Sequence, residues 1–570
     1  MDFGSEAVSY SQFACIGAGF SGIGLGASLK RWYGITDIRI FDRHTQLGGT
    51  WYISRYPGCA CDVPSALYSF SFEPNPSWTR ILPSSQELWN YLHHVADKYD
   101  LISRMTLGVN VEEATWIEDR SRWRLTYRAV NSDQVYYHES DFLFAGTGQL
   151  VTPRELDVPG IESFRGPVMH SARWREDVDL KQKKVVLFGN GCTAAQIVPS
   201  IVHETGHLTQ IVRSKHWIMP PIDVPIPAWA RLMLRYVPGL LKLFRFIVFL
   251  LAENALRGFP LTQSAAKFRA GRRQIAEGYM RRTAPAKYHD ILIPDWEIGC
   301  KRRIFDSGYL QSLHADNITL TNSKALEILP NGVKTTDGFI EADVLVLANG
   351  FVTNNYLDNI KITGRNDITL REHWERFGGP EAYNCSAVSG FPNFFLLLGP
   401  NSVTGHTSAI MASENSINYA LRIIKPVLVG KAQSVNIRPE AEQRYSDGIQ
   451  HALKNTVFSS GCGSWYVRGT NEGKEWNAMT YPWSQGYYWY ENLFPNRKDW
   501  EYQSCKPGLL TRAANLVNQM SCLLKDSWVF HGGHYQNIER LSRGIACRLN
   551  KCHGDVYGVD VGSSVFGVGM

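Results

Sequence analysis

The sequence lacks the features that would assign it to several common classes of protein. Its longest uncharged apolar stretch near the middle of the chain, Phe246–Ala252, is far shorter than the roughly twenty residues that a membrane-spanning helix needs. Its first residues, Met1–Glu6, carry neither the basic region nor the apolar run of a signal peptide. The net charge of +6 is small for 570 residues, and there is no basic arm, so nucleic acid is not an expected partner.

The eleven cysteines form no recognisable redox or metal motif. No CxxC occurs, and Cys59 and Cys61 have the wrong spacing for a redox pair. Cys547, Cys552 and His553 lie near the C-terminus, but no second pair of ligands at zinc spacing accompanies them. We therefore expect no metal ion, and we predict reduced thiols in a cytoplasmic enzyme.

What the sequence does contain is a dinucleotide-binding fingerprint near its start. A short apolar run, Phe13–Ile16, leads into the turn Gly17-Ala18-Gly19-Phe20-Ser21-Gly22, and a second strand, Ile38–Phe41, ends at Asp42. Glycines at 17, 19 and 22 allow a tight turn and a close approach of backbone N–H groups to a pyrophosphate, while the acid can accept a ribose hydroxyl. The alternative, a tight turn that binds no ligand, is weakened by the complete strand, helix, strand and acid context.

A second fingerprint follows the strand Lys184–Phe188. Its turn consists of Gly189, Asn190, Gly191, Cys192, Thr193 and Ala194, with alanine in place of the third glycine. The next strand ends at Arg213, followed by Ser214 and Lys215, where an NADH-binding fold would place an acid. Cations at this position accommodate a 2′-phosphate, so we predict NADPH rather than NADH. A solvated basic triplet at a strand end is the alternative interpretation.

A helical, basic segment follows the second fingerprint, over about residues 228–288. Leu240, Leu243, Phe244, Ile247, Val248 and Leu251 share one face of a predicted helix. A helix whose apolar face packs on the core is the favoured interpretation, and a helix lying on a membrane surface is the alternative.

Several motifs, taken in order, resemble those of the class B flavin monooxygenases, and most closely the Baeyer–Villiger type. They are Gly48-Gly49-Thr50-Trp51, the run Arg55-Tyr56-Pro57-Gly58 that closes on Asp62, the sequence FRGPVMHSARW at 164–174, which fits FxGxxxHxxxW, and Gly299-Cys300-Lys301-Arg302. Two positions depart from the family pattern: Arg175 stands where Pro or Asp is usual, and Asn349 where Thr is usual. The resemblance extends over about residues 11 to 500.

The resemblance implies the cofactors and the roles of the matching residues. FAD would bind at Gly17, Gly19, Gly22, Asp42, Thr50, Trp51, Asp62 and Tyr68, and NADPH at the second turn, Arg213, Ser214, Lys301 and Trp465. Arg302 would face the flavin with Asp62 holding it in position, and these two are the predicted catalytic residues. Phe164, Gly166, His170 and Trp174 would form a linker that couples cofactor movement, without proton transfer by His170.

The same resemblance implies the fold and the activity. We expect an α/β protein with two Rossmann-like domains, in which the NADPH domain is inserted in a discontinuous FAD domain and carries a helical insertion. The expected boundaries are 1–155 and 385–500 for FAD, 156–225 and 296–384 for NADPH, 226–295 for the helices, and 501–570 for a C-terminal tail. The expected reaction uses O₂ to convert a bulky, apolar ketone of polyketide or terpenoid metabolism into an ester or lactone.

Three other functions remain open at this point. An N- or S-oxygenating flavin monooxygenase is disfavoured by Asp62 and Trp174, because the related enzymes usually end the linker motif in Tyr. A flavin disulfide reductase shares the two folds but needs the missing CxxC. A nucleotide-binding homologue without catalysis is disfavoured by the intact Arg302, Asp62 and His170. The oligomeric state is not predicted.

Overall fold

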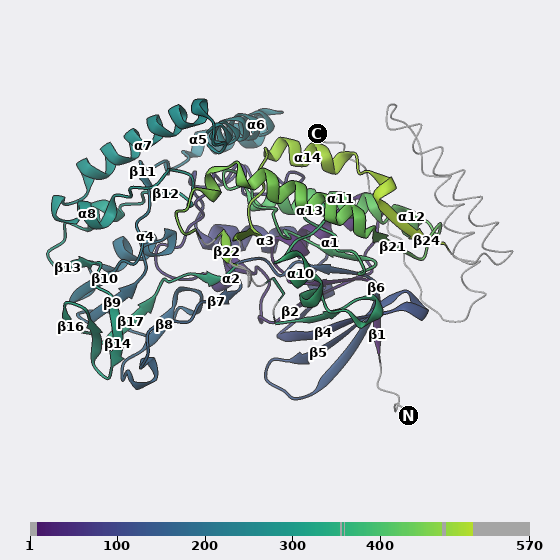
Figure 1. Cartoon of the computed structure of the whole chain (residues 1–570), viewed down its shortest axis with the longest axis horizontal. Coiled ribbons are helices and arrows are strands. Elements are labelled where there is room, and N and C mark those ends of the chain that lie inside the picture. The colour runs from purple at the N-terminus through teal and green to yellow at the C-terminus, as the bar shows by residue number, and fades with distance from the viewer. Residues whose placement is uncertain (1–7, 354–355, 358, 465, 470–474, 505–570) are drawn as a thin grey trace.

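The protein is described from a computed structural model, which describes residues 8–353, 356–357, 359–464, 466–469 and 475–504. Two sheet-based units lie side by side, and helices run along one long edge across both of them (Figure 1). The first unit contains the N-terminal strands and the second the strands from the middle of the chain.

The first sheet is mixed and has eight strands among the described residues. These are β1 (Ser9–Ile16), β2 (Ile38–Asp42), β3 (Met105–Leu107), β4 (Val109–Ile117), β5 (Arg122–Ala129), β6 (Val135–Ala145), β19 (Lys361–Thr363) and β20 (Phe394–Leu396). Strand β1 pairs in parallel with both β2 and β6, and helix α1 (Phe20–Tyr33) connects β1 to β2. The predicted first strand–turn–helix–strand unit is therefore confirmed.

The second sheet has five strands, all parallel. They are β8 (Val168–His170), β9 (Lys184–Phe188), β10 (His207–Ile211), β13 (Ile318–Thr321) and β17 (Val344–Leu347). Helix α4 (Cys192–Ile201) connects β9 to β10 and repeats the arrangement of the first unit. Because β6 precedes this sheet in sequence and β20 follows it, the second fold is inserted in the first, as predicted.

The chain returns to the first sheet earlier than the predicted boundary at 385. Strand β19 pairs with β4, with Ile362 opposite Ala114, before β20 joins β6. The sequence gives no signal for the return at β19, because this strand is only three residues long and carries no motif. The segment that contains β20 is easily recognised, so the predicted boundary lies next to it. The other boundaries stay predictions.

The predicted helical segment separates two short paired strands, β11 (Ile218–Met219) and β12 (Ile304–Phe305). It contains α5 (Ala228–Tyr236), α6 (Leu240–Glu253), α7 (Gln263–Thr283) and α8 (His289–Leu292). The helical prediction is confirmed, but the predicted apolar stripe of α6 only partly faces the core: Val248 packs on it, whereas Leu243, Ile247 and Leu251 are exposed. Apolar residues occupy both faces of α6, so periodicity could not tell which side packs on the protein.

Further elements complete the part of the chain that the structure describes. The helices are α2 (Thr50–Ile53), α3 (Ser85–Lys98), α9 (Tyr309–Ser312), α10 (Leu370–Phe377), α11 (Ala409–Ile423), α12 (Lys425–Leu428), α13 (Pro439–Lys454) and α14 (Gln485–Leu493). The strands are β7 (Thr152–Pro153), β14 (Ala325–Leu329), β15 (Gly332–Thr335), β16 (Gly338–Glu341), β18 (Phe351–Val352), β21 (Ser434–Ile437), β22 (Val467–Gly469), β23 (Glu475–Asn477) and β24 (Trp500–Gln503). None of the described helices combines the length and the apolarity needed to cross a bilayer.

Candidate active site

The first glycine turn has the geometry that a dinucleotide requires. Gly17 has a φ of 113°, and a Cβ at this position would lie 2.4 Å from the carbonyl oxygen of Gly146. A Cβ on Gly22 would lie 2.0 Å from the carbonyl oxygen of Gly17, so only glycine fits at either position. Gly19 differs, since its Cβ would be 3.6 Å from the nearest atom, the Cα of Gly49. The packing of the protein therefore does not require glycine at position 19, and the missing side chain leaves space for a ligand.

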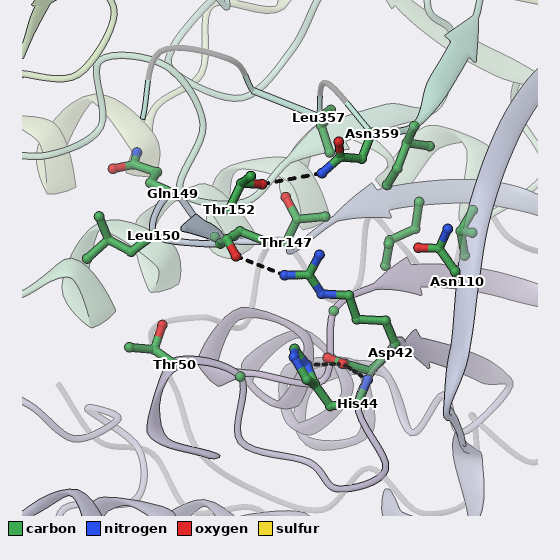
Figure 2. A pocket seen from close by; sticks show the side chains of 18 of the residues that line it. Asp42, His44, Thr50, Asn110, Thr147, Gln149, Leu150, Thr152, Leu357 and Asn359 are labelled. Carbon is green, nitrogen blue, oxygen red and sulfur yellow. Dashed lines mark hydrogen bonds and ion pairs between the residues drawn. The ribbon is translucent and has the colours of Figure 1, made fainter. Parts of the chain in front are cut away.

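A cleft of about 960 Å³, counted with its open mouth, lies at the carboxyl ends of β1 and β2 (Figure 2). Gly17, Asp42 and Thr50 of the predicted FAD site line it. Ligands of open α/β sheets bind at this edge, where parallel strands end. The donor set fits a dinucleotide, because a glycine turn, a ribose-binding acid and a threonine hydroxyl border one space.

Sequence reasoning missed most of the cleft wall. The missed residues are Arg43 and His44, together with residues of the segments 109–111, 147–152, 352–353, 356–357 and 359–360, among them Asn110, Thr147 and Gln149. Only Arg43 and His44 had a signal, as the residues that directly follow Asp42. The other segments approach the cleft through sheet pairing and carry no motif of their own.

The carboxylate of Asp42 is firmly held at the bottom of this cleft. It accepts hydrogen bonds from the backbone N–H of Ala18 (2.8 Å) and from the backbone N–H and ring of His44 (2.9 Å each). Burial alone would raise the pKa of Asp42, but these hydrogen bonds outweigh it and hold the pKa below its ordinary value. Asp42 is therefore an anionic acceptor at neutral pH, as the ribose-binding role requires.

Two aromatic residues of the predicted FAD site contact each other. The indole N–H of Trp51 donates to the hydroxyl of Tyr68 (3.3 Å), and the rings meet edge to face. Trp51 is buried on α2, whereas Thr50 at the start of α2 is exposed toward the cleft. Tyr68 also lies near Asp62, since burial and, to a smaller extent, the charge of Asp62 raise the pKa of Tyr68.

The second glycine turn repeats the geometry of the first. Gly189 has a φ of 127°, and a Cβ there would lie 2.3 Å from the carbonyl oxygen of Ala348. A Cβ on Gly191 would meet nothing within 4 Å, so this position faces open space. The Asn190 side chain is buried, and its oxygen accepts from Tyr309 and Gln210, whereas its Nδ2 has no hydrogen-bond partner among the described residues. Ala194 is buried under the turn at the start of α4.

Arg213 and Lys301 are brought close together from positions far apart in the sequence. Burial lowers the pKa of Lys301, and the charge of Arg213 lowers it further. Within the described residues neither cation forms a salt bridge, and Lys301 lies 4.3 Å from the ring centroid of Trp296. Two like charges without an acidic partner form a site suited to an anion such as a 2′-phosphate. Ser214 follows Arg213 and is half-buried.

Asp62 and Arg302 form a bidentate ion pair. The Nε and Nη2 of Arg302 donate to the two carboxylate oxygens of Asp62, each at 2.6 Å. Burial alone would raise the pKa of Asp62, but the charge of Arg302 reverses this and holds the pKa below its ordinary value. The charge of Asp62 raises the pKa of Arg302, whereas burial and the neighbouring Arg302 lower the pKa of Arg303 to about 10. Arg302, and not Arg303, is therefore the paired cation.

The two glycine-turn units meet at this ion pair. The Cys192 thiol lies 3.9 Å from Oδ2 of Asp62, which places the second turn beside the pair. The Tyr56 hydroxyl donates to the side-chain oxygen of Gln196 on α4 (2.8 Å). Gly58 packs so closely on α4 that a Cβ would lie 2.6 Å from the Gln196 carbonyl oxygen. The segment around Tyr56 to Asp62 thus fastens the first unit to the second.

The FxGxxxHxxxW motif packs within the second unit, and its linker role stays a prediction. Phe164 and Trp174 pack in apolar clusters, and a Cβ on Gly166 would lie 2.1 Å from the carbonyl oxygen of Asp343. The His170 Nδ1 accepts from the N–H of Ala172 (3.1 Å), so its Nε2 carries the proton and donates to the Gly350 carbonyl (3.0 Å). Burial lowers the pKa of His170, which keeps the ring neutral.

The prediction of reduced thiols is wrong for one pair of cysteines. Cys300 and Cys462 form a disulfide across 162 residues of sequence, while Cys15, Cys59, Cys61, Cys192 and Cys385 are free. The pairing has no spacing signature because the fold alone brings the two residues together. The bond joins the segment of Lys301 and Arg302 to the loop that leads to Trp465, a predicted NADPH contact that lies outside the described residues. Cysteine usage therefore no longer argues for a reducing compartment.

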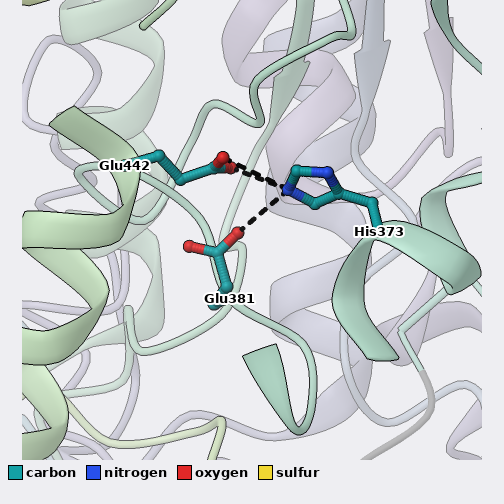
Figure 3. A group of neighbouring side chains, drawn as sticks. All are labelled: His373, Glu381 and Glu442. Carbon is teal, nitrogen blue, oxygen red and sulfur yellow. Dashed lines mark hydrogen bonds and ion pairs between the residues drawn. The ribbon is translucent and has the colours of Figure 1, made fainter. Parts of the chain in front are cut away.

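His373, Glu381 and Glu442 form a buried cluster of side chains (Figure 3). Their donor atoms lie within 4.8 Å of one another, a spacing that a divalent cation could bridge. A shared proton also fits this geometry, because burial and the charge of Glu442 raise the pKa of Glu381 well above its ordinary value. Glu442 accepts from Ser389 and His373. The expected absence of a metal ion stays a prediction.

Comparison with known proteins agrees with the two dinucleotide-binding folds. Residues 15–84 match a family model described as an NAD(P)-binding Rossmann-like domain. The chain resembles the closed crystal structure of cyclohexanone monooxygenase with a TM-score of 0.78 at 23% identity, over 88% of this chain and 100% of the other. It resembles the oxidized steroid monooxygenase bound to NADP with a TM-score of 0.75 at 24% identity, over 87% and 100%.

The fold is thus that of flavin-dependent monooxygenases with two dinucleotide-binding domains. A Baeyer–Villiger monooxygenase of Streptomyces coelicolor is 34% identical over 80% of this chain and 86% of the relative. The FAD-binding monooxygenase ktnD of Aspergillus niger is 32% identical over 82% of this chain and 78% of the relative. The chain belongs to the Baeyer–Villiger monooxygenase family.

Proposed function

We propose that this Baeyer–Villiger monooxygenase uses FAD and NADPH to insert one oxygen atom of O₂ into a bulky, apolar ketone, giving an ester or a lactone in specialised metabolism. The observation that carries the proposal is the Arg302–Asp62 ion pair at the meeting point of the two folds. FAD belongs in the cleft at Asp42, and NADPH at the second turn with its 2′-phosphate between Arg213 and Lys301.

Bound FAD, reduced by NADPH, supplies the activation of dioxygen. Arg302 provides a fixed cation beside the negative charge that develops on the substrate carbonyl oxygen. Asp62 orients the guanidinium, so the cation need not reorganise as that charge forms. A guanidinium suits the role because it stays charged and cannot donate its proton at neutral pH.

An apolar substrate is supported by the surroundings of Arg302. Cys300, two residues before it, belongs to a buried cluster with Phe259, Phe458 and Tyr466. Burial raises the pKa of Tyr466 to about 12, so this cluster offers no acid near neutral pH. Low polarity on this side favours an apolar ketone and strengthens the electrostatic effect of Arg302.

The test is turnover by the purified yellow protein. NADPH oxidation should follow addition of a bulky ketone, and mass spectrometry should show a product with one more oxygen atom. A panel of cyclic and steroid-like ketones is compared with thioethers and amines in the same assay. Oxygenation of the thioethers or amines, with none of the ketones, would replace the proposal with the N- or S-oxygenating alternative.

A further inference from the structure

The outer face of helices α5 and α6 is apolar and exposed. On α6 the residues Leu243, Phe246, Ile247, Leu250 and Leu251 recur at the spacing of one helical stripe, and Leu251 is 69% exposed. On α5, Trp229 and Tyr236 are 66% and 71% exposed. Among the described residues nothing covers this stripe. Exposed apolar surface of this extent marks an interaction site.

The opposite side of α6 is fixed to the protein, so the stripe does not face outward by loose packing. Arg245 donates to the Ala66 carbonyl (2.7 Å) and to the backbone and hydroxyl oxygens of Ser69 (2.9 Å each). Val248, Phe249 and Ala252 pack against the core of the first unit. Arg245 therefore points into the protein and the apolar stripe points outward. This is the reverse of the orientation expected for a helix whose outer face is exposed to water.

The apolar face continues onto α14, which lies along the same edge of the molecule (Figure 1). Glu253 at the end of α6 accepts from the backbone N–H of Gln485 at the start of α14 (3.1 Å), which ties the two helices together. Trp489 and Tyr490 on α14 and Phe494 just after it are all exposed. Trp and Tyr at the rim of an apolar surface are typical of proteins that sit at a membrane–water interface.

The charge of this face identifies its partner. From Val224 to Ala252 the chain has no Asp or Glu, and the cations left for a partner are Arg231, Arg235 and Lys242, because Arg245 points into the protein. A symmetric contact between two copies would place these cations against their own counterparts without an acid in the segment to neutralise them. Anionic lipid headgroups neutralise them directly.

We infer that α5, α6 and α14 form a docking surface for an anionic lipid bilayer, on which the enzyme lies without spanning it. The helices enter the headgroup region by their apolar stripe, and the cations contact lipid phosphates. The helical segment begins and ends at the paired strands β11 and β12, and Arg302 lies two residues before the start of β12. The docked face therefore belongs to the segment that carries the active-site arginine. This inference does not depend on the proposed ketone.

The experiment is co-sedimentation of the full-length flavoprotein with vesicles of phosphatidylcholine alone or mixed with phosphatidylglycerol. We expect binding to the mixed vesicles that weakens at high salt. Phe246→Asp should lower the partition coefficient by about tenfold or more, because it places a charge in the apolar stripe. Lys242→Gln should lower it by about fivefold on the anionic vesicles alone.

The matched control is Phe339→Asp on β16, a site of similar exposure, 46% against 55% for Phe246. It should bind vesicles as the wild type does, and all variants should keep their flavin spectrum and turnover of a water-soluble ketone. Absence of wild-type binding to the anionic vesicles overturns the inference, as does equal loss in Phe339→Asp. If the wild type is a dimer that does not bind vesicles, and Phe246→Asp converts it to a monomer, the face binds a second copy. That outcome also overturns the inference.

Discussion

Arg302 donates two hydrogen bonds of 2.6 Å to Asp62, a residue 240 positions earlier in the chain. The side chains are 28% and 26% exposed, so the pair lies open to a ligand yet is shielded from bulk water. A planar guanidinium held by both carboxylate oxygens has a fixed direction. Such a pair adds little to the free energy of unfolding, because burial of both ions offsets much of their attraction. Its main effect is to hold the charge of Arg302 in one position.

Replacing Arg302 by Ala should lower ester formation by about a hundredfold or more, the loss typical of one electrostatic contact at a transition state. FAD and NADPH should still bind, and NADPH should still be oxidised, with release of hydrogen peroxide. Arg302→Lys should restore the rate only in part, since an ammonium lacks the fork. The measurement is ester formed per NADPH oxidised.

The matched control for Arg302 is Arg438→Ala, which breaks the exposed ion pair with Glu501 and should leave the ester yield unchanged. A normal ester yield from Arg302→Ala would show that this arginine takes no part in oxygenation. Loss of flavin from the same variant would assign it a structural role instead.

Arg213→Ala should raise the KM for NADPH by about ten- to a hundredfold and leave the KM for NADH nearly unchanged, because a charged phosphate contact contributes about 1.5–3 kcal/mol. Steady-state kinetics with both coenzymes measures this. Lys183→Ala removes an exposed cation elsewhere in the second unit and should change neither value. Equal losses with NADPH and NADH would contradict a phosphate contact.

Gly19→Val and Gly191→Val form a matched pair that separates the two cofactor sites. Neither glycine has a positive φ, and neither added Cβ would clash with the protein, so both variants should fold. Gly19→Val should be colourless, because the side chain fills the space for the flavin dinucleotide. Gly191→Val should stay yellow with a raised KM for NADPH. Full flavin retention by Gly19→Val, read from the absorbance spectrum, would show that FAD binds elsewhere.

Cys462→Ala should lower the melting temperature, because the disulfide to Cys300 restrains a loop of 162 residues in the unfolded chain. Loss of a native disulfide costs about 2–5 kcal/mol. Ester yield per NADPH should also fall, since the bond steadies the segment of Arg302. A peptide map without reductant should contain the linked Cys300 and Cys462 peptides. Two separate, freely alkylated peptides would show that the thiols are reduced in the protein.

Glu381→Gln should stabilise the protein at alkaline pH. The folded-state pKa of Glu381 is raised, so its ionisation is disfavoured in the folded protein, and the wild type loses stability as pH rises above the ordinary value near 4.5. The gain in melting temperature of the variant should therefore shrink as the pH falls toward that value. Glu375→Gln, an exposed change of the same charge on α10, is the control.

Elemental analysis accompanies the Glu381 experiment. The test is whether a tightly bound divalent metal is present in the wild type and is lost, together with stability, in Glu381→Gln. That result would show that His373, Glu381 and Glu442 hold a metal ion and not a shared proton. A melting-temperature difference that does not change with pH would show that Glu381 does not hold a proton in the folded protein.

The sequence by itself determined the two dinucleotide folds and their order. Gly17 and Gly189 have a positive φ, and Gly22 packs on the carbonyl oxygen of Gly17, so the turn itself requires these glycines, and a turn between a strand and a helix is a short-range structure. Asp42 and the missing acid at Arg213 lie at strand ends, so their positions also follow from local spacing. The family motifs then indicated that Asp62 and Arg302 belong to one site.

Only the tertiary structure decided how the distant parts meet. The contact of Cys192 with Asp62, the Cys300–Cys462 disulfide and the early return of β19 join residues that no sequence period relates. The orientation of α6 was undecidable for a similar reason, since a helix with apolar residues on both faces does not specify which one is covered. That choice depends on the position of Arg245 against Ser69, a contact between segments 176 residues apart.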